Sequence, residues 1–473
     1  MTDSSIVAPT QRARLPLWMV LFAVAIVAGS ALFAAGEPLA GALVIVTPLL
    51  PFVYYALFRA ISGDQHFGPL LATAIFFILC SNFRYRDVVE KTIDWQVALQ
   101  LLAICGTLGV SVLFFRPIIR HFNLHVFACW LSLYVVLLCS SFYALSPLYA
   151  GVSTISLIGS FLYLCYLCIQ YGRDRMVEIL VWAGLLMCAG SIAAYFAIPE
   201  FGRMKNWFGD DLLLTSRMQG LFGSSNGTGI AAATLLLLTI LFYMRQPGAS
   251  RFIGWATIVT AFVCLLLSIN RMAVGAFLLS LLVYFLVTGR FGQRLLLLLS
   301  LAVLAVVPVL LFPDAVFELV SRTGNAEEIS SGTGRTRIWA VVLELIPRSW
   351  LIGYGYASAQ SILPFRPDLF DAAVHTHNLY LEVLFSSGVI GLVVLMWCIL
   401  ATIILAVRVG GARELSFFVF FLPYGLTEPV IGGVTDFGII MWQASVVLLF
   451  YRAKLLEFAA ARVASPPTQG HGA

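Results

Sequence analysis

The strongest candidate for chemistry is the run from His375 to Glu382, which holds two histidines, an asparagine and a glutamate. A long apolar segment follows, so we expect the run to lie at the first turn of a membrane-spanning helix. A histidine there meets the positive end of the helix dipole, which favours neutral imidazole and leaves a lone pair that can accept a proton. Either His375 or His377 can therefore be a general base, with Asn378 and Glu382 as further candidates, and Glu382 lies on the same helix face.

The same residues also suit a purely structural role. Asn378 is a good amino-terminal cap for a helix, an interaction worth about 1 kcal/mol. Gly388 and Gly391 lie farther along the same segment and permit close packing of helices. Spacing alone leaves both interpretations open.

Arginine dominates the basic residues: lysine accounts for only three of the 28, at Lys91, Lys205 and Lys454. A GC-rich genome can produce this bias by itself. The positions need a further reason, because many arginines fall in segments that we predict to face outward: Arg203, Arg217, Arg271, Arg322, Arg335, Arg337, Arg348 and Arg366. Guanidinium groups are planar forks of donors that suit phosphate oxygens, so an anionic ligand on the outer face would explain them.

The elements that must position these residues are membrane-spanning helices. A chain that is 61% hydrophobic and 11% charged is not a soluble globular protein, a disordered chain or a coiled coil. The alternating pattern of an outer-membrane barrel is absent too. We predict an all-α polytopic membrane protein with roughly 12 to 14 transmembrane helices and a large outer loop containing short helices.

The predicted spans are uninterrupted apolar segments at 16–35, 39–58, 69–83, 96–115, 126–145, 152–171, 177–198, 228–244, 252–269, 272–288, 295–312, 379–406, 414–430 and 436–451. Basic residues recur in every second connection, from Arg12 and Arg14 onward, so we expect the amino terminus to be cytoplasmic. The first segment exceeds a signal peptide's apolar region in length, which predicts an uncleaved anchor.

The domain plan follows from the spans. We predict an amino-terminal helix bundle at 1–312 with an outer loop at 199–227, a long outer loop at 313–378, carboxy-terminal spans at 379–452 and a cytoplasmic tail at 453–473. A loop as long as 313–378 is usually functional. Within it, 335–346 has Ile338, Trp339, Val342 and Leu345 on one helical face, so we expect an amphipathic helix lying flat on the outer membrane surface.

These motifs resemble those of a known family. His377-Asn378, nine further residues and then Gly388-x-x-Gly391 is similar to the signature of bacterial O-antigen ligases, within the wider O-antigen ligase and polymerase superfamily. The resemblance covers roughly residues 210–395 and is also carried by shorter patterns: Arg217-x-x-Gly220 with Asn226, Ser268 with Arg271, Gly334-Arg335 with Trp339, and Ile352-Gly353-Tyr354-Gly355. Asn270 departs from the pattern, since the family often has serine before the arginine.

The resemblance implies an activity on the periplasmic side of the bacterial inner membrane. It implies transfer of a polysaccharide from undecaprenyl pyrophosphate to the lipid A-core, with His377 as base, Arg217, Arg271 and Arg335 on the pyrophosphate, and Arg337 as a further candidate. Chemistry agrees, because arginines can neutralise a pyrophosphate leaving group without a metal, so one base suffices for an inverting displacement. Beyond donor, acceptor and membrane lipids, we expect no cofactor and no nucleic acid.

Other functions stay open on the sequence. A polymerase joining lipid-linked repeats and a protein O-oligosaccharyltransferase differ from the ligase only in the acceptor. A metal-dependent transferase would use Glu37, Asp210 and Asp211, although no histidine or third acid accompanies them. A lipid or polysaccharide exporter would form no glycosidic bond, and the scarcity of ionisable residues within the spans disfavours a proton-coupled one.

Overall fold

The computed structural model describes residues 64–84, 94–122, 124–208, 211–311, 335–366, 369 and 373–464. The predicted spans at 16–35 and 39–58, the first part of the long outer loop, and Glu37, Asp210 and Arg322 lie outside these residues. The chain divides into two units, Met1–Leu71 and Ala72–Ala473. All the candidate site residues described here belong to the second unit.

Apolar helices make up most of the described chain. The first group is α3 (Phe67–Cys80), α4 (Trp95–Leu113), α5 (Phe115–His121), α6 (His125–Ser141), α7 (Pro147–Ala197) and α8 (Pro199–Gly202). The second is α9 (Ser225–Leu241), α10 (Arg251–Ser268), α11 (Arg271–Thr288), α12 (Phe291–Leu311), α15 (Arg335–Leu345), α16 (Ala359–Ile362), α17 (Leu379–Arg408), α18 (Ala412–Val419), α19 (Phe421–Tyr424) and α20 (Phe437–Ala464).

Seven helices in the described part of the chain are long and apolar enough to cross a membrane. One of them, α7, is 51 residues long and contains Gly172 with a φ of 81°, so it joins two predicted spans across a kink. The chain is therefore an all-α polytopic membrane protein, as predicted. The total number of spans stays a prediction, because the first two candidates are not described.

The helices form an interior and a periphery. In α9, 83% of the most apolar stretch is buried within the protein, whereas in α11 only 17% is, so α11 presents most of its surface outward. Polar side chains inside the bundle are paired across helices: Ser160 with Gln443 at 2.9 Å, and Trp130 Nε1 with Thr402 Oγ1 at 2.9 Å. Such pairs satisfy groups that could not be hydrated in a bilayer and fix the helix register.

One local element was not predicted, and one predicted span was wrong. The outer loop at 199–227 contains an antiparallel hairpin, β1 (Arg203–Phe208) with β2 (Asp211–Met218), within an otherwise helical protein. The predicted span at 414–430 consists of the short helices α18 and α19 and ends at Tyr424. Pro423 lies in the last turn and Gly425 follows it, and the chain from there to α20 is irregular. This segment, residues 425–436, is the final loop.

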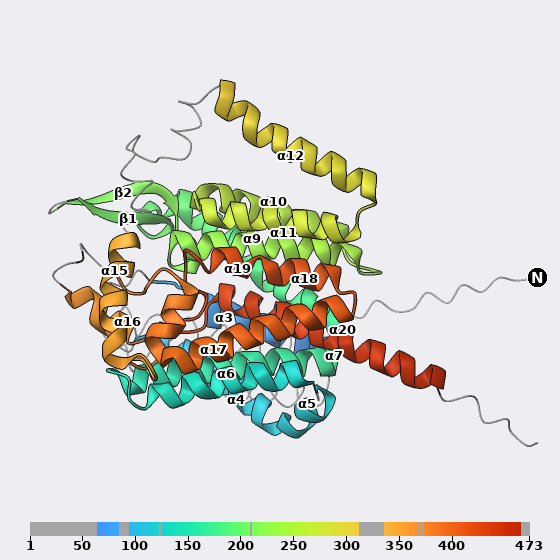
Figure 1. The fold of residues 1–473 in the computed structure, drawn as a ribbon, viewed down its shortest axis with the longest axis horizontal. Coiled ribbons are helices and arrows are strands. Elements are labelled where there is room, and N and C mark those ends of the chain that lie inside the picture. Colours follow the sequence, from blue (N-terminus) through green and yellow to red (C-terminus); the bar gives the residue numbers. More distant parts are fainter. Residues whose placement is uncertain are drawn as a thin grey trace, which may run out of the picture. The chain divides into compact units, whose positions relative to one another are not determined.

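The amphipathic helix predicted at 335–346 exists as α15, but its apolar face packs against protein. Val342 and Leu345 are buried in a cluster with Leu363 and Phe385. The expectation that this face would lie on the membrane surface was wrong, because α16 and the start of α17 supply the apolar partner. Figure 1 shows α15 running across the direction of α17.

The connections gather at two ends of the helices. At one end, Asn82 N donates to Leu221 O at 2.7 Å and Arg217 Nε to Ser268 O at 3.3 Å. At the other, Gln246 Nε2 donates to Asp174 O at 3.1 Å and Arg452 Nε to Val409 O at 3.1 Å. This grouping is the one that alternating basic connections require, with the hairpin, α15 and α16 at the predicted outer end (Figure 1).

Candidate functional site

The predicted histidines lie where α17 begins. Asn378 is the amino-terminal cap, and its Oδ1 accepts hydrogen bonds from Tyr380 N at 2.9 Å and Leu381 N at 3.0 Å. His377 precedes the cap with a φ of 51°, in the left-handed region that histidine enters more readily than most residues. Asn378 therefore has the capping role, while His377 remains free for another.

Thr376 fixes the positions of the two histidines that flank it. It is fully buried, its N–H donates to Glu382 Oε2 at 2.9 Å, and its carbonyl accepts from Trp339 Nε1 at 3.0 Å. Glu382, a candidate from the sequence, thus contacts the backbone between the two histidines. The rings of His375 and His377 are edge to face, with centroids 4.1 Å apart.

A carboxylate that the sequence did not single out pairs with His377. Glu428, in the final loop, is 4% exposed, and its Oε2 lies 3.2 Å from His377 Nδ1. A carboxylate can only accept, so this contact places the proton of the neutral imidazole on Nδ1 and the lone pair on Nε2. The arrangement is that of a general base oriented by an acid.

The charges around the pair keep Glu428 ionised. Burial raises the pKa of Glu428, but the hydrogen bond with His377 and the charges of the neighbouring histidines and of Arg335 outweigh it and lower the pKa to about 2. Burial lowers the pKa of His375 to about 3, assisted by the charge of His377 and opposed by that of Glu428. His375 is therefore neutral near pH 7, beside a permanent carboxylate.

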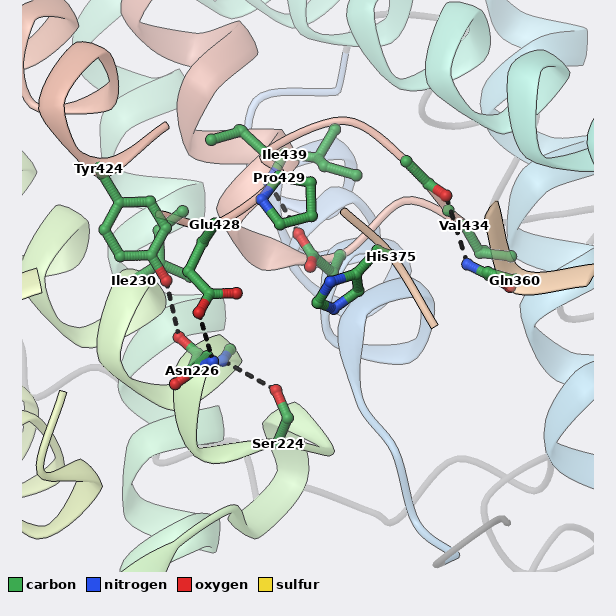
Figure 2. Close-up of a pocket in the computed structure, with 15 residues that line it drawn as sticks. Ser224, Asn226, Ile230, Gln360, His375, Tyr424, Glu428, Pro429, Val434 and Ile439 are labelled. Carbon is green, nitrogen blue, oxygen red and sulfur yellow. Dashed lines mark hydrogen bonds between the residues drawn. The ribbon is translucent and has the colours of Figure 1, made fainter. Parts of the chain in front are cut away.

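Two predicted arginines are linked to this carboxylate, Arg335 directly and Arg217 through Asn226. Arg335 Nη2 donates to Glu428 Oε1, which also accepts from Asn226 Nδ2 at 2.6 Å. Asn226 Oδ1 in turn accepts from Arg217 Nη2 at 3.2 Å. The structure thus brings Arg217, Arg335 and His377 together through Glu428 and Asn226, although they come from distant parts of the chain. Figure 2 shows the hydrogen bond between Glu428 and Asn226 at the centre of this network.

Asn270 and Tyr424 support this network from outside. Tyr424 Oη donates to Asn226 O at 3.2 Å, and Asn270 Nδ2 lies 3.4 Å from both Asn226 O and Tyr424 Oη. Asn270 also caps α11, since its Oδ1 accepts from Ala273 N at 3.0 Å. The asparagine that departs from the family pattern therefore holds two parts of the site in register.

Two of the predicted arginines have exposed side chains. Arg271 directly follows Asn270, so its backbone borders the site, and the residue is exposed. Arg337 is also exposed, on α15. The sequence predicted that Arg271 would join Arg217 and Arg335; Arg335 contacts Glu428 and Arg217 contacts Asn226, while the role of Arg271 stays a prediction.

The glycine pair of the motif joins α17 to the preceding loop. Gly388 has a φ of 65°, and a Cβ there would lie 2.2 Å from the backbone of Leu351. This close approach lets Val389 N donate to Trp350 O at 2.9 Å and Tyr354 N to Phe385 O at 2.8 Å. Gly388 thus holds the residue 350–355 segment against the helix that begins at His377.

His375, His377 and Glu428 also offer three possible metal ligands, with ligand atoms within 4.8 Å of one another. The sequence predicted no ligand set at this point. Both Glu428 oxygens already accept hydrogen bonds, and a cation there would meet the positive charge of Arg335. These contacts favour a hydrogen-bonded pair over a metal centre.

Sequence reasoning missed Glu428 because it fell inside a predicted span. One signal was available: Glu428-Pro429 lies between Gly425 and the pair Gly432-Gly433, a pattern that breaks a helix. That pattern predicts an outer turn that contains Glu428, and a carboxylate in such a turn is a candidate site residue.

The comparisons with known proteins identify the central part of the chain. Residues 256–396 match the sequence model of the O-antigen ligase family. No curated protein matches the chain at a comparable level. The matched segment contains Arg271, Arg335, His377 and both motif glycines, while Arg217, Asn226 and Glu428 lie outside it. Over residues 256–396 the chain therefore matches the O-antigen ligase domain, which supports the O-antigen ligase superfamily.

Proposed function

We propose that the protein is a metal-independent, inverting glycosyltransferase of the inner membrane. It moves O-antigen polysaccharide from undecaprenyl pyrophosphate to the lipid A-core on the periplasmic side. The observation that carries the proposal is the His377–Glu428 pair, with Arg335 and Arg217 attached to the same carboxylate and amide. The family match supports a ligase or polymerase in general.

The reaction needs one proton transfer and one displacement. His377 Nε2 takes the proton of an acceptor hydroxyl, whose oxygen attacks the anomeric carbon of the donor sugar. The new C–O bond forms as the bond to the pyrophosphate oxygen breaks, and the electron pair leaves with the pyrophosphate. Attack from the opposite face inverts the anomeric carbon, and the imidazolium returns its proton to water.

Each charged residue has a distinct task in this step. Glu428 stabilises the imidazolium that forms on His377, as an ionised partner does in other base-catalysed transfers. Arg335 and Arg217 compensate the charge that develops on the pyrophosphate, and Arg271, exposed at the start of α11, is available to a phosphate approaching from outside. No step requires a cation, so the reaction should proceed in EDTA.

A deletion strain distinguishes the acceptors. Gel analysis should show lipid A-core without attached chains while lipid-linked polymer accumulates. Core that bears a single repeat would instead identify a polymerase, and normal chains on the core would contradict both activities. Transfer by purified protein, with and without EDTA, tests the metal-independent mechanism and separates an enzyme from an exporter, which forms no glycosidic bond.

A further inference from the structure

A cavity of about 160 Å³ opens beside the His–Glu pair. Glu428 and His375 form one wall, Gln360 lies on the far side, and Asp436 lies at the start of α20 (Figure 2). The volume corresponds to on the order of ten water molecules, which is close to the size of one sugar ring. A lipid-linked polysaccharide could place only a single residue in this space.

The charges of the cavity exclude a phosphate. Neither arginine nor lysine is among the described residues that line it, and its carboxyl and imidazole groups are those of Glu428, Asp436 and His375. Burial raises the pKa of Asp436 to about 6 against the opposing effect of backbone hydrogen bonds. A pyrophosphate would be repelled by the permanent charge of Glu428, whereas a neutral ligand with hydroxyl groups would not.

The polar groups of the cavity suit hydroxyls. Among the described residues, His375 Nδ1 is buried without a hydrogen-bond partner, and His375 lines the cavity. Gly432 and Gly433 expose backbone there, and Gln360 Nε2 reaches Gly432 O at 3.3 Å. Five apolar side chains also line the cavity: Ile230, Pro429, Val430, Val434 and Ile439. A sugar ring has this mixed character, with hydroxyls at its edge and C–H groups on its faces.

We infer that this cavity is the acceptor subsite, which holds the sugar ring whose hydroxyl is to be glycosylated. The inference rests on the proposed function and assigns the two substrates to different groups around Glu428. The donor pyrophosphate binds the arginines, which do not line the cavity, and the acceptor ring binds among Gln360, His375 and Asp436. Its hydroxyl at the His375 edge lies next to His377, since the two rings are in contact.

Two conservative variants probe the subsite. Gln360→Leu removes a hydrogen-bonding side chain with little change in size. Asp436→Asn removes the carboxyl group but keeps the contact with Ile439 N, now 2.8 Å, because asparagine caps helices as well as aspartate does. Gln246→Leu is the matched control: Gln246 is also partly buried and bonds a backbone carbonyl, at the opposite end of the helices.

The test is steady-state transfer by purified protein in lipid nanodiscs, with lipid-linked polysaccharide as donor and isolated lipid A-core as acceptor. Loss of one neutral hydrogen bond should raise the acceptor KM roughly three- to tenfold in both cavity variants. The donor KM and the Gln246→Leu control should stay at wild-type values.

The outcomes separate the two hypotheses. A raised donor KM with an unchanged acceptor KM overturns the acceptor assignment, and so do unchanged KM values in both variants of an active enzyme. A wild-type protein that transfers nothing to either a core or a lipid-linked repeat refutes the proposed function, and the subsite with it.

Discussion

His377 and Glu428 are 51 residues apart in sequence, yet Nδ1 of one lies 3.2 Å from Oε2 of the other. Backbone contacts set this separation. Leu379 N donates to Gly425 O at 2.7 Å, and Asn378 Nδ2 to Leu426 O at 3.0 Å, so the start of α17 is tied to the final loop on both sides of the pair. Main-chain contacts therefore position His377 against Glu428 before any substrate binds.

Replacing His377 by asparagine should abolish transfer while the protein accumulates normally. Asparagine tolerates the left-handed backbone of this position, so the variant removes the base without adding strain. Loss of a general base costs about 10²- to 10⁴-fold in rate. Rate and melting temperature of the purified variant should be measured together; near wild-type transfer would refute the catalytic role.

Glu428→Gln should lower kcat by on the order of 10²-fold or more, because the neutral amide no longer stabilises the imidazolium. The defect should not add to that of His377→Asn, since both variants disable one unit. The double variant provides the check. Losses that multiply in full would show that Glu428 acts independently of His377.

Lysine at Arg335 or Arg217 should impair transfer although the charge is kept. Arg217 uses Nε for Ser268 O and Nη2 for Asn226 Oδ1, two directions that one ammonium group cannot reproduce. Arg348→Lys is the control, because the Arg348 side chain is 68% exposed and pairs with the exposed Glu344 at 4.0 Å. Full activity in both site variants would contradict a role for the guanidinium geometry.

Acid should destabilise the protein in part through His375. Unfolded chains take up a proton on this residue near its ordinary pKa of 6.5, whereas the folded protein resists protonation until about pH 3. The free energy of unfolding therefore falls as the pH drops through this window. Glu428 adds a second loss only between about 4.5 and 2, where its unfolded form protonates first.

Melting temperatures at pH 7 and pH 5 isolate the histidine contribution. His375→Asn should show a smaller decrease between these two pH values than the wild type does, and the same substitution at exposed His125 serves as the control. An equal decrease in His375→Asn and wild type would show that this imidazole is solvated in the folded protein.

Gly388→Ala should reduce stability far more than Gly391→Ala. The left-handed backbone alone costs roughly 1–3 kcal/mol for a residue with a side chain, and the new Cβ would also meet main-chain atoms of Leu351 at 2.2 Å. At Gly391 the backbone is not left-handed, and the nearest atoms, at 1.8 and 2.6 Å, belong to the Ser387 side chain rather than to backbone. Thermal unfolding of the two variants measures the difference. Equal stability would show that the backbone conformation and close packing of Gly388 do not stabilise the protein.

The sequence indicated the segment from His375 to Glu382 better than the residues that contact it. Local rules were sufficient for the cap at Asn378 and the helix at α15, because both depend on a few neighbouring residues. The positions of Glu428 and of the cavity depend on where α19 ends. That end could not be located from the sequence, because the apolar composition continues beyond it. The exposure of Arg271 is likewise a property of tertiary packing, which its neighbours in sequence do not reveal.

The order in which the site is assembled has a consequence for biosynthesis. Arg217, Arg335 and His377 emerge from the ribosome well before Glu428, whose loop follows nearly all the other helices. A partly made chain already in the membrane thus carries an arginine cluster and an unpaired imidazole, and it gains an oriented base only when the final loop has been translocated. Under the proposed function, transfer therefore cannot begin until the final loop is in place.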